Sequence, residues 1–410
     1  MKILVLNAGS SSLKSCLYEL AEPLPELPPV PLWEGHVEWE EPFKNVRLRV
    51  KREGKQVVDE QPAIRSERAA SEHLLQTLWQ GPARVMASPD EVDVVGHRVV
   101  HGGEKYSAPT IVTSDVKQAI SGLSVFAPEH NPAEAEGIEI AEQVFKSQPQ
   151  LAVFDTAFHQ SMPKPAAIYP GPYAWFEQGI RRYGFHGISH QYCAERAAQI
   201  LGKDLESLRL VTCHLGHGCS LAAVRDGRSV DTTMGFTPLE GLMMGSRCGT
   251  IDPGILIHLL REEKYSVDRL EELLNRESGL LGVSGVSDDM RQIMSAIEEG
   301  NSRAKLAFDT FVHRLRRHIG AMISSLGGLD ALAFTAGIGE NSPQVRAEAC
   351  AGFEFLGLKL DRQKNSESPV DCDVATADSA VGVVVVAARE DWAIAKECWK
   401  LMRPERIPAS

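Results

Sequence analysis

The sequence lacks the features of a nucleic-acid-binding protein and of a secreted, disulfide-rich protein. Its eight cysteines include no C-x-x-C pair and no closely spaced framework. We therefore expect reduced thiols in a cytoplasmic protein and no zinc site. Acidic side chains outnumber basic ones by 55 to 43, which gives a net charge of -12. This charge argues against a protein held on nucleic acid by phosphate contacts.

Long apolar runs are also missing. The longest, residues 381–388, is far shorter than the roughly 18 residues that a membrane span needs. The apolar run before Asn7 is too short for the apolar region of a signal peptide. We therefore expect a soluble protein without a membrane partner.

The length and the order of apolar runs indicate the fold class. At 410 residues the chain is too long for one hydrophobic core, so we expect two domains of roughly 150 to 200 residues with a cleft between them. Apolar runs alternate with helical patterns, which predicts an α/β architecture with buried sheets. The strand-like runs are residues 2–7, 92–100, 151–154, 209–213, 331–335 and 381–388.

Two segments of the chain match each other without a gap. ILVLNAGSSSLKSCLYE, from residue 3, and LVTCHLGHGCSLAAVRD, from residue 210, each read as an apolar strand, a small polar turn and a second strand, with Gly9 and Gly216 aligned. This predicts duplicated halves that face one cleft. Two unrelated β-hairpins are the alternative.

Glycine-containing turns follow apolar strands at residues 7–14, 214–220 and 335–342, although none is a Walker loop or a G-x-G-x-x-G fingerprint. In the first turn, glycine and serines allow backbone amides to approach a phosphate, and Lys14 adds positive charge. Asn7 offers an uncharged oxygen to a metal ion. Structural turns without a ligand are the alternative reading.

Several loops lead directly into predicted helices, whose N-termini favour anions. Asn131 is predicted to cap one helix, with Glu134 as the acid of its capping box. Ser189 is predicted to cap a second helix, just after His186, and Ser342 a third, directly after AGIGEN.

Four charged residues lie where a ligand could meet them. Arg98 and Arg247 are in glycine-flanked stretches without helical periodicity, and a guanidinium presents planar donors to a carboxylate or phosphate. Asp155 ends a buried strand and Glu390 lies at a strand-to-helix junction, where carboxylates suit magnesium. Ordinary ion pairs and helix caps are the alternatives.

Together these segments resemble the acetokinase family, which belongs with sugar kinases, heat-shock ATPases and actin. The collinear motifs are NAGSSSLK, GHRVVHGGE, HNPA, FDTAFH, RYGFHGISH, HLGHG, GFTPLEGLMMGSRCG, SDDMR and GIGEN. The resemblance implies a two-domain actin-like ATPase fold with a duplicated βββαβα core, in which residues 1–155 plus 390–410 form one domain and residues 156–389 the nucleotide-binding one. It implies a homodimer that transfers the γ-phosphoryl group of ATP to acetate, reversibly and directly in line, giving acetyl phosphate and ADP with Mg²⁺ or Mn²⁺.

The resemblance also implies roles for single residues. Asn7 and Glu390 match the metal site, while Arg98 and Arg247 match the arginines that hold the carboxylate and the phosphoryl group. The other catalytic matches are His186, as a donor to the phosphoryl group, His130 in support, and Asp155. The acetate pocket would add Val100, Phe185 and Pro238. The ATP site would comprise Ser10, Ser12, Lys14, His214, Leu215, Gly216, His217, Gly218, Asp289, Met290, Arg291, Gly337, Ile338, Gly339, Glu340 and Asn341.

The chemistry of this reaction limits what Asp155 can do. A carboxylate nucleophile is already ionised at pH 7 and needs no strong general base. The task is then positioning and electrostatic stabilisation of a metaphosphate-like transition state. We therefore expect Asp155 to lie near magnesium or to orient an arginine.

The chain departs from the family pattern at three positions. His217 stands where the family usually has Asn, Glu129 where it has Leu beside the acetate methyl group, and Arg389 where it has Asn. A kinase for propionate or another short carboxylate is therefore one alternative. A nucleotide switch of the actin or chaperone type, or an inactive nucleotide-binding relative, is another.

Overall fold

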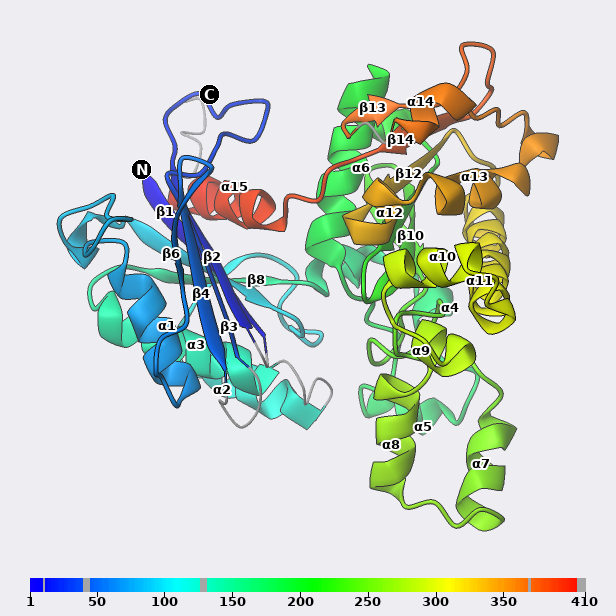
Figure 1. Cartoon of the computed structure of the whole chain (residues 1–410), viewed down its shortest axis with the longest axis horizontal. Helices are drawn as coiled ribbons and strands as arrows, with labels where there is room; N and C mark the ends of the chain where they lie inside the picture. The colour runs from blue at the N-terminus through cyan, green and yellow to red at the C-terminus, as the bar shows by residue number, and fades with distance from the viewer. Residues whose placement is uncertain (10–11, 40–44, 126–130, 368–369, 404–410) are drawn as a thin grey trace. The chain divides into compact units, whose positions relative to one another are not determined.

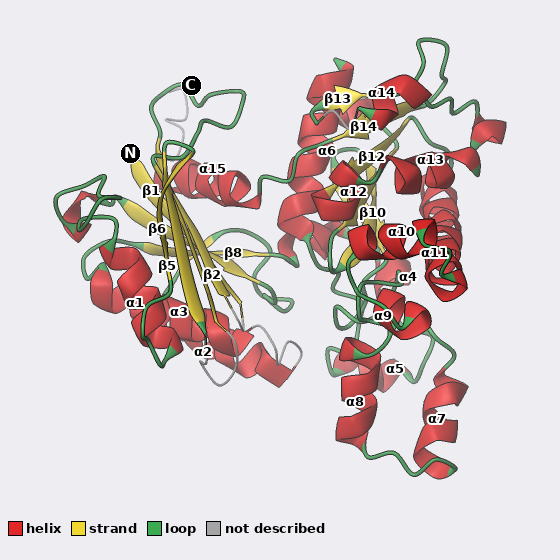
Figure 2. Ribbon diagram, viewed as in Figure 1, coloured by secondary structure: helices red, strands yellow, loops and turns green. Residues whose placement is uncertain are grey.

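The computed structural model describes residues 1–9, 12–39, 45–125, 131–367 and 370–403. The chain forms two compact units, Met1–Ala157 with Arg389–Ser410, and Phe158–Ala388 (Figure 1). Each unit is a mixed α/β structure built on one sheet (Figure 2). The predicted α/β class is confirmed, and each of the six predicted strand runs overlaps a strand.

The sheet of the first unit has the order β5-β4-β3-β2-β1-β6-β8-β7. Neighbouring strands are antiparallel from β5 to β1, whereas β1, β6 and β8 are parallel. The strands are β1 (Lys2–Gly9), β2 (Ser12–Glu19), β3 (Trp33–Trp39), β4 (Val46–Arg52), β5 (Lys55–Glu60), β6 (Val94–Val99), β7 (Thr110–Ile111) and β8 (Gln150–Phe154).

Helices cover both faces of this sheet. On β2, Leu13 and Leu17 belong to the core under α1 and α3, while the alternate residues Cys16 and Tyr18 meet α15. This is the two-residue period of a strand buried on both faces. The helices are α1 (Glu67–Gln76), α2 (Ser114–Gly122), α3 (Asn131–Val144) and α15 (Glu390–Met402), with short 3₁₀ turns at Pro89–Glu91 and Leu123–Val125.

The sheet of the second unit has the order β11-β10-β9-β12-β14-β13. Its strands are β9 (Leu210–Leu215), β10 (Cys219–Arg225), β11 (Arg228–Thr232), β12 (Ala331–Thr335), β13 (Cys372–Asp373) and β14 (Gly382–Val385). Its helices are α4 (Lys164–Ala167), α5 (Tyr173–Glu177), α6 (Gly187–Leu201), α7 (Pro253–Arg261), α8 (Val267–Arg276), α9 (Gly279–Ser284), α10 (Met290–Glu298), α11 (Ser302–Leu326), α12 (Ala336–Asn341), α13 (Pro343–Ala351) and α14 (Arg362–Ser366). Further 3₁₀ turns are Ala157–Ser161, Leu205–Ser207 and Glu354–Leu356.

The two sheets share a duplicated core. The order β3-β2-β1-β6-β8 corresponds to β11-β10-β9-β12-β14, and in both the first three strands are antiparallel and the last three parallel. The predicted duplication is therefore confirmed, and the alternative of two unrelated hairpins is wrong.

The gapless superposition of the two hairpins needs one correction. Gly9 pairs with Ser12 across the first turn, whereas Leu215 pairs with Cys219 across the second. The second turn is one residue longer, so the superposition is right for the first strand and shifted by one residue for the second. Because side chains alternate along a strand, that shift places aligned residues of β2 and β10 on opposite faces.

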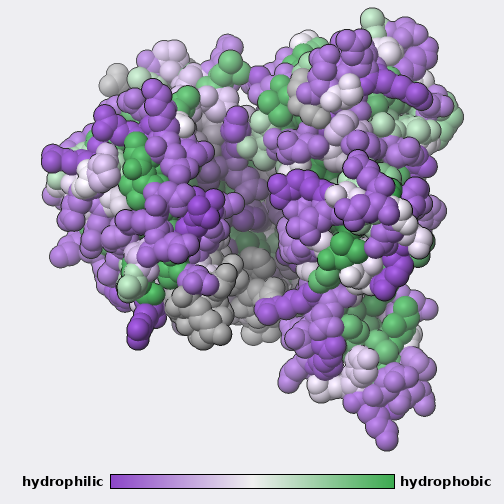
Figure 3. All heavy atoms as spheres, viewed as in Figure 1, coloured by the Kyte–Doolittle hydropathy of each residue, from purple (hydrophilic) through white to green (hydrophobic). Residues whose placement is uncertain are grey.

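Polar side chains cover most of the face shown in Figure 3, and an apolar group lies near α7 and α8, where Ile255, Ile257 and Leu260 are exposed. In the part of the chain that the structure describes, no helix is long and apolar enough to cross a membrane.

Candidate active site

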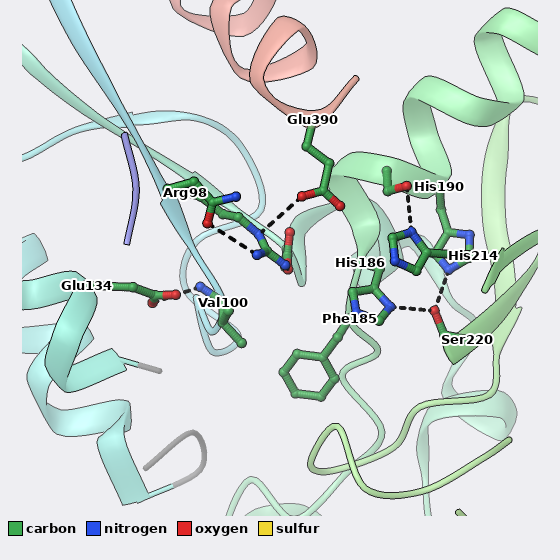
Figure 4. Close-up of polar contacts among 12 residues, drawn as sticks. Arg98, Val100, Glu134, Phe185, His186, His190, His214, Ser220 and Glu390 are labelled. Carbon is green, nitrogen blue, oxygen red and sulfur yellow. Dashed lines mark hydrogen bonds and ion pairs between the residues drawn. The ribbon is translucent and has the colours of Figure 1, made fainter. Parts of the chain in front are cut away.

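Arg98 is the centre of a polar cluster in the first unit. It lies near the end of β6, and Asp155 directly follows β8, the parallel neighbour of β6. Nη2 of Arg98 donates to Oδ2 of Asp155 at 2.6 Å, and Nη1 donates to Oδ1 of Asn7 on β1 at 3.4 Å. Nε of Arg98 is 3.9 Å from Oε2 of Glu390, the first residue of α15 (Figure 4). Four elements therefore bring these side chains together.

The charges of this cluster do not cancel. Burial lowers the pKa of Arg98, but the carboxylates of Asp155 and Glu390 raise this pKa by more than burial lowers it. The guanidinium therefore stays protonated. Asp155 is only 2% exposed in its side chain, whereas Arg98 and Glu390 are 18% and 20% exposed. One guanidinium against two carboxylates leaves a net negative charge at the carboxyl ends of parallel strands. Such a place suits a cation or the water around it.

In the second unit, His186 and Arg247 meet at a glycine of the β9–β10 turn. A Cβ atom on Gly218 would lie 3.4 Å from Nη1 of Arg247 and 3.5 Å from Nε2 of His186. Nη1 of Arg247 also donates to the carbonyl oxygen of Pro238 at 3.1 Å. The missing side chain thus leaves a space bordered by an arginine, a histidine and backbone, which is the composition of a phosphate site.

His186 is held in an unusual conformation by its neighbours. It precedes α6 with φ of 57°, in the left-handed region that non-glycine residues rarely adopt. Its Nδ1 is 2.9 Å from Oγ of Ser220, and its ring stacks on His214 with centroids 4.1 Å apart (Figure 4). Strained residues of this kind concentrate at functional sites, because the surrounding contacts must fix them.

The hydroxyl of Ser220 couples His186 to a second imidazole. Oγ of Ser220 is also 2.7 Å from Nε2 of His190, whose Nδ1 is 2.7 Å from Oγ1 of Thr212. Burial, with the nearby imidazoles of His159 and His214, lowers the pKa of His190 well below its ordinary value. A hydroxyl has one proton and donates to one ring only. The tautomers of His186 and His190 are therefore linked through Ser220.

A family model described as "Acetokinase family" matches residues 2–396. The chain belongs to the acetokinase family. A protein of a Cyanothece species named acetate kinase is 60% identical over 98% of this chain and 99% of its own length. The crystal structure of Porphyromonas gingivalis acetate kinase has a TM-score of 0.90 at 38% identity and covers 98% of this chain and 99% of that one. A propionate kinase from Francisella tularensis has a TM-score of 0.88 at 38% identity, with 97% and 98% covered.

Membership of the acetokinase family makes the chain a kinase that transfers phosphate to a carboxylate. The candidate nucleotide segments of the second unit lie beside one another. Thr335, at the end of β12, pairs with His214 of β9, so α12 begins next to the β9–β10 turn. Gly245 packs between His217 and the backbone of Asp288, which precedes α10. Asp289, Met290 and Arg291 are thus next to the same turn.

Two interactions fix the ends of these nucleotide segments. Oδ1 of Asp289 accepts from the backbone amide of Arg291 at 2.8 Å, which caps α10. The fully buried Arg346 donates to the carbonyl oxygens of Gly339 and Glu340 at the end of α12. Burial lowers the pKa of Arg346 to about 10. Arg346 therefore ties α12 to α13 within the second unit.

The remaining predicted residues are distributed as follows. Val100 is buried in the first unit, and Phe185 is buried in the second. On β2, Lys14 is exposed and pairs with Asn7 across the ladder. Nε2 of His217 is 3.0 Å from Oδ2 of Asp288, and both side chains are exposed. Leu215 is buried on β9, and Ser12 is half-buried on β2. Gly216 lies in the β9–β10 turn, and α12 contains Gly337, Ile338 and Asn341. Ser10, Glu129 and His130 lie outside the described residues.

Three local predictions are wrong. Ser189 does not cap α6: the helix begins at Gly187, and Oγ of Ser189 instead contacts Nδ1 of His214 at 2.8 Å. The predicted capping box of α3 does not form: among the described residues Oδ1 of Asn131 accepts no hydrogen bond, and the carboxylate of Glu134 accepts from the amide of Val100. Residues 336–341 form α12 and not an open glycine turn, since Arg346 satisfies carbonyls at the end of the helix. Ser342, by contrast, caps α13 as predicted.

Sequence reasoning assigned no role in the site to Glu134, His190, Ser220 or Arg346. His190 lies within the motif RYGFHGISH. This motif indicates that the segment belongs to the site, but it does not indicate a role for His190. Ser220 is 30 residues from His190 and meets it through the pairing of β9 with β10, which no spacing in the sequence reveals.

Proposed function

We propose that the protein is an acetate kinase that reversibly transfers the γ-phosphoryl group of ATP to acetate. One oxygen of acetate forms a bond to the γ-phosphorus, the bond from that phosphorus to the oxygen of the leaving diphosphate breaks, and the products are acetyl phosphate and ADP. The observation that carries the proposal is the Arg98 cluster: a protonated guanidinium with Asp155, Asn7 and Glu390 at the ends of parallel strands.

The chain's own residues supply orientation and positive charge. Arg98 binds the carboxylate of acetate, and Asp155 keeps its guanidinium oriented through the 2.6 Å contact. His186 and Arg247, which converge on Gly218, stabilise the negative charge on the transferring phosphoryl group. No step needs a proton, because acetate is already ionised. This is why we assign Asp155 to orientation and not to acid–base work.

The residues present fit a magnesium ion. Mg²⁺ is usually held by one or two carboxylates together with substrate phosphates and water. Glu390 and the amide oxygen of Asn7 are such ligands, both beside Arg98. Among the described residues, no group of three or more His, Cys, Asp or Glu side chains could hold a metal alone, which agrees with a site completed by phosphate. The ion, when bound, would neutralise charge on the phosphates of ATP.

Propionate is the main alternative acceptor, since a propionate kinase is among the similar solved structures. Val100, which follows β6 two residues after Arg98, would contact the alkyl end of the substrate. We assign acetate as the preferred acceptor because relatives about 60% identical over the whole chain carry that name. The preference is a prediction for the specificity constants.

A hydroxamate assay tests the proposed function. The protein, MgATP and hydroxylamine are mixed with acetate, propionate or butyrate, and the acyl hydroxamate is measured. We expect acetyl hydroxamate, with the largest kcat/KM for acetate. A larger kcat/KM for propionate would make it a propionate kinase. ATP binding without any acyl hydroxamate would make it a nucleotide switch or an inactive relative and would overturn the proposal.

We also propose that the protein works in the cytoplasm as a homodimer. All eight cysteines are free, which suits a reducing compartment. No residue of α7 is buried, although the helix carries Ile255, Ile257 and Leu260. A second copy covering these side chains would remove apolar area from water. Light scattering should give the mass of two chains, and Ile257→Glu should shift it towards one.

A further inference from the structure

Glu134 is a carboxyl group in a place where apolar side chains are expected. It lies on the face of α3 that packs on the sheet, with Asn131, Ile138 and Ala141 on the same face, and it is 3% exposed. Glutamate is almost never this buried unless it is paired. Its position therefore calls for a specific partner.

The partner is the backbone beside the proposed acetate site. Oε2 of Glu134 accepts from the amide of Val100 at 3.0 Å (Figure 4). Val100 directly follows β6 and is two residues from Arg98. This bond fixes the segment that carries both the guanidinium and the side chain assigned to the acetate methyl group. Any change in Glu134 is thus transmitted to the carboxylate site.

The surroundings of Glu134 favour its uncharged form. The pKa of Glu134 is raised to about 8: burial is the largest cause, the amide of Val100 and the charge of Arg98 lower the pKa, and the charge of Asp155 raises it. A further titratable group beside this segment is His101, buried one residue beyond Val100, whose pKa burial lowers to about 4. Between pH 7 and 9, therefore, His101 stays neutral while Glu134 loses its proton.

We propose that Glu134 is a positioning residue of the carboxylate site. In its uncharged form Glu134 holds Val100 through the hydrogen bond and leaves the positive charge of Arg98 to the substrate. In its ionised form Glu134 competes with the substrate for that charge. Arg98 already faces Asp155 and Glu390. A third carboxylate would add to the net negative charge of the cluster and weaken the hold of Arg98 on an anion. The affinity for acetate then falls as the pH rises, because acetate itself is ionised throughout this range.

The pH dependence of the two KM values tests this inference, which rests on the proposed function. For the wild type we expect the KM for acetate to rise by up to about tenfold between pH 7 and pH 9, as for a site that binds only with Glu134 protonated, while the KM for ATP changes little. Glu134→Gln keeps the shape and the hydrogen bond but cannot ionise, so its KM for acetate should stay constant.

Glu139 provides the matched control, because it lies exposed on the same helix. Glu139→Gln should show the wild-type rise in KM. A wild-type KM for acetate that is flat from pH 7 to 9, or an equal rise in Glu134→Gln, would overturn the inference even if that variant folded poorly. Failure of the proposed function would look different: the wild type would form no acetyl hydroxamate at any pH.

Discussion

At the scale of single residues, the ion pair of Arg98 and Asp155 sets the charge of the carboxylate site. Asp155 is buried, so its carboxylate interacts with the guanidinium with little screening by water. The 2.6 Å contact favours orientation of Arg98 over proton transfer as the role of Asp155.

Asp155→Asn should lower kcat/KM for acetate by about 10² because the guanidinium loses its orienting partner. It should leave the shape of the pH profile of kcat between pH 6 and 9 unchanged, since no proton passes through residue 155. Steady-state kinetics at several pH values and Mg²⁺ concentrations measure both. The exposed pair of Arg47 and Asp59 is the control, and Asp59→Asn should have wild-type kinetics. If the pH profile of kcat lost its acidic or its basic limb in Asp155→Asn, Asp155 would carry a proton in the reaction.

The sequence identified residues at strand ends better than residues that support them. Asp155 follows a buried apolar strand, and Glu390 begins a helix at a strand-to-helix junction, as predicted for both. Ser220 could not be found, because the gapless match aligned it with an apolar residue of the first hairpin, and its role depends on the longer β9–β10 turn. The spacing of Glu134 from Asn131 predicts a capping box, but a side chain with this spacing can equally reach a neighbouring strand, as Glu134 does at the amide of Val100.

At the scale of elements, α15 must pack closely on β6 for Glu390 to reach Arg98. Gly96 of β6 lies directly under this helix: a Cβ atom there would be 2.5 Å from Sγ of Cys398 and 3.0 Å from Ile394. The close approach of helix and strand therefore requires glycine.

Gly96→Ala should destabilise the first unit by about 1–3 kcal/mol, the usual cost of overpacking a core. It should also lower kcat, because α15 carries Glu390. Thermal unfolding and steady-state kinetics measure the two effects. Gly122→Ala is the control, since a Cβ atom there meets nothing within 4 Å. Equal melting temperatures for the two variants would contradict close packing of α15 on β6.

Strands were predicted from sequence more reliably than helix starts. Buried strands are continuous apolar runs, such as residues 331–335, which a window of sequence reveals directly. A helix start depends on which of several polar residues makes the capping bond. The sequence predicts a cap at Ser189, yet His186 precedes the helix in a left-handed conformation, and the helix begins at Gly187.

At the scale of the whole molecule, buried imidazoles connect stability with pH. Burial lowers the pKa of His97, His101 and His159 to about 4, and that of His190 well below its ordinary value. In the unfolded chain these groups take up protons near pH 6.5. The unfolded state therefore binds more protons than the folded state as the pH falls below 6.5.

The free energy of unfolding should accordingly fall from pH 6.5 towards pH 4, by up to about 1.4 kcal/mol per pH unit for each group. Glu134 and Asp391 act in the opposite sense over part of this range, because burial raises the pKa of both, but they are two groups against these four imidazoles. We expect a clearly lower apparent melting temperature at pH 5 than at pH 7. Exposed His313→Gln should show the same slope. A melting temperature that did not fall at pH 5 would show that these imidazoles are protonated in the folded state.

The most direct test of the whole account is the rate of phosphoryl transfer after removal of Arg247. If catalysis depends on positive charge held in place, Arg247→Ala should lower kcat for acetyl phosphate formation by about 10³-fold, or about 4 kcal/mol. Arg317→Ala, at an exposed position of α11, should retain the wild-type rate. A loss of less than tenfold in Arg247→Ala would contradict the account.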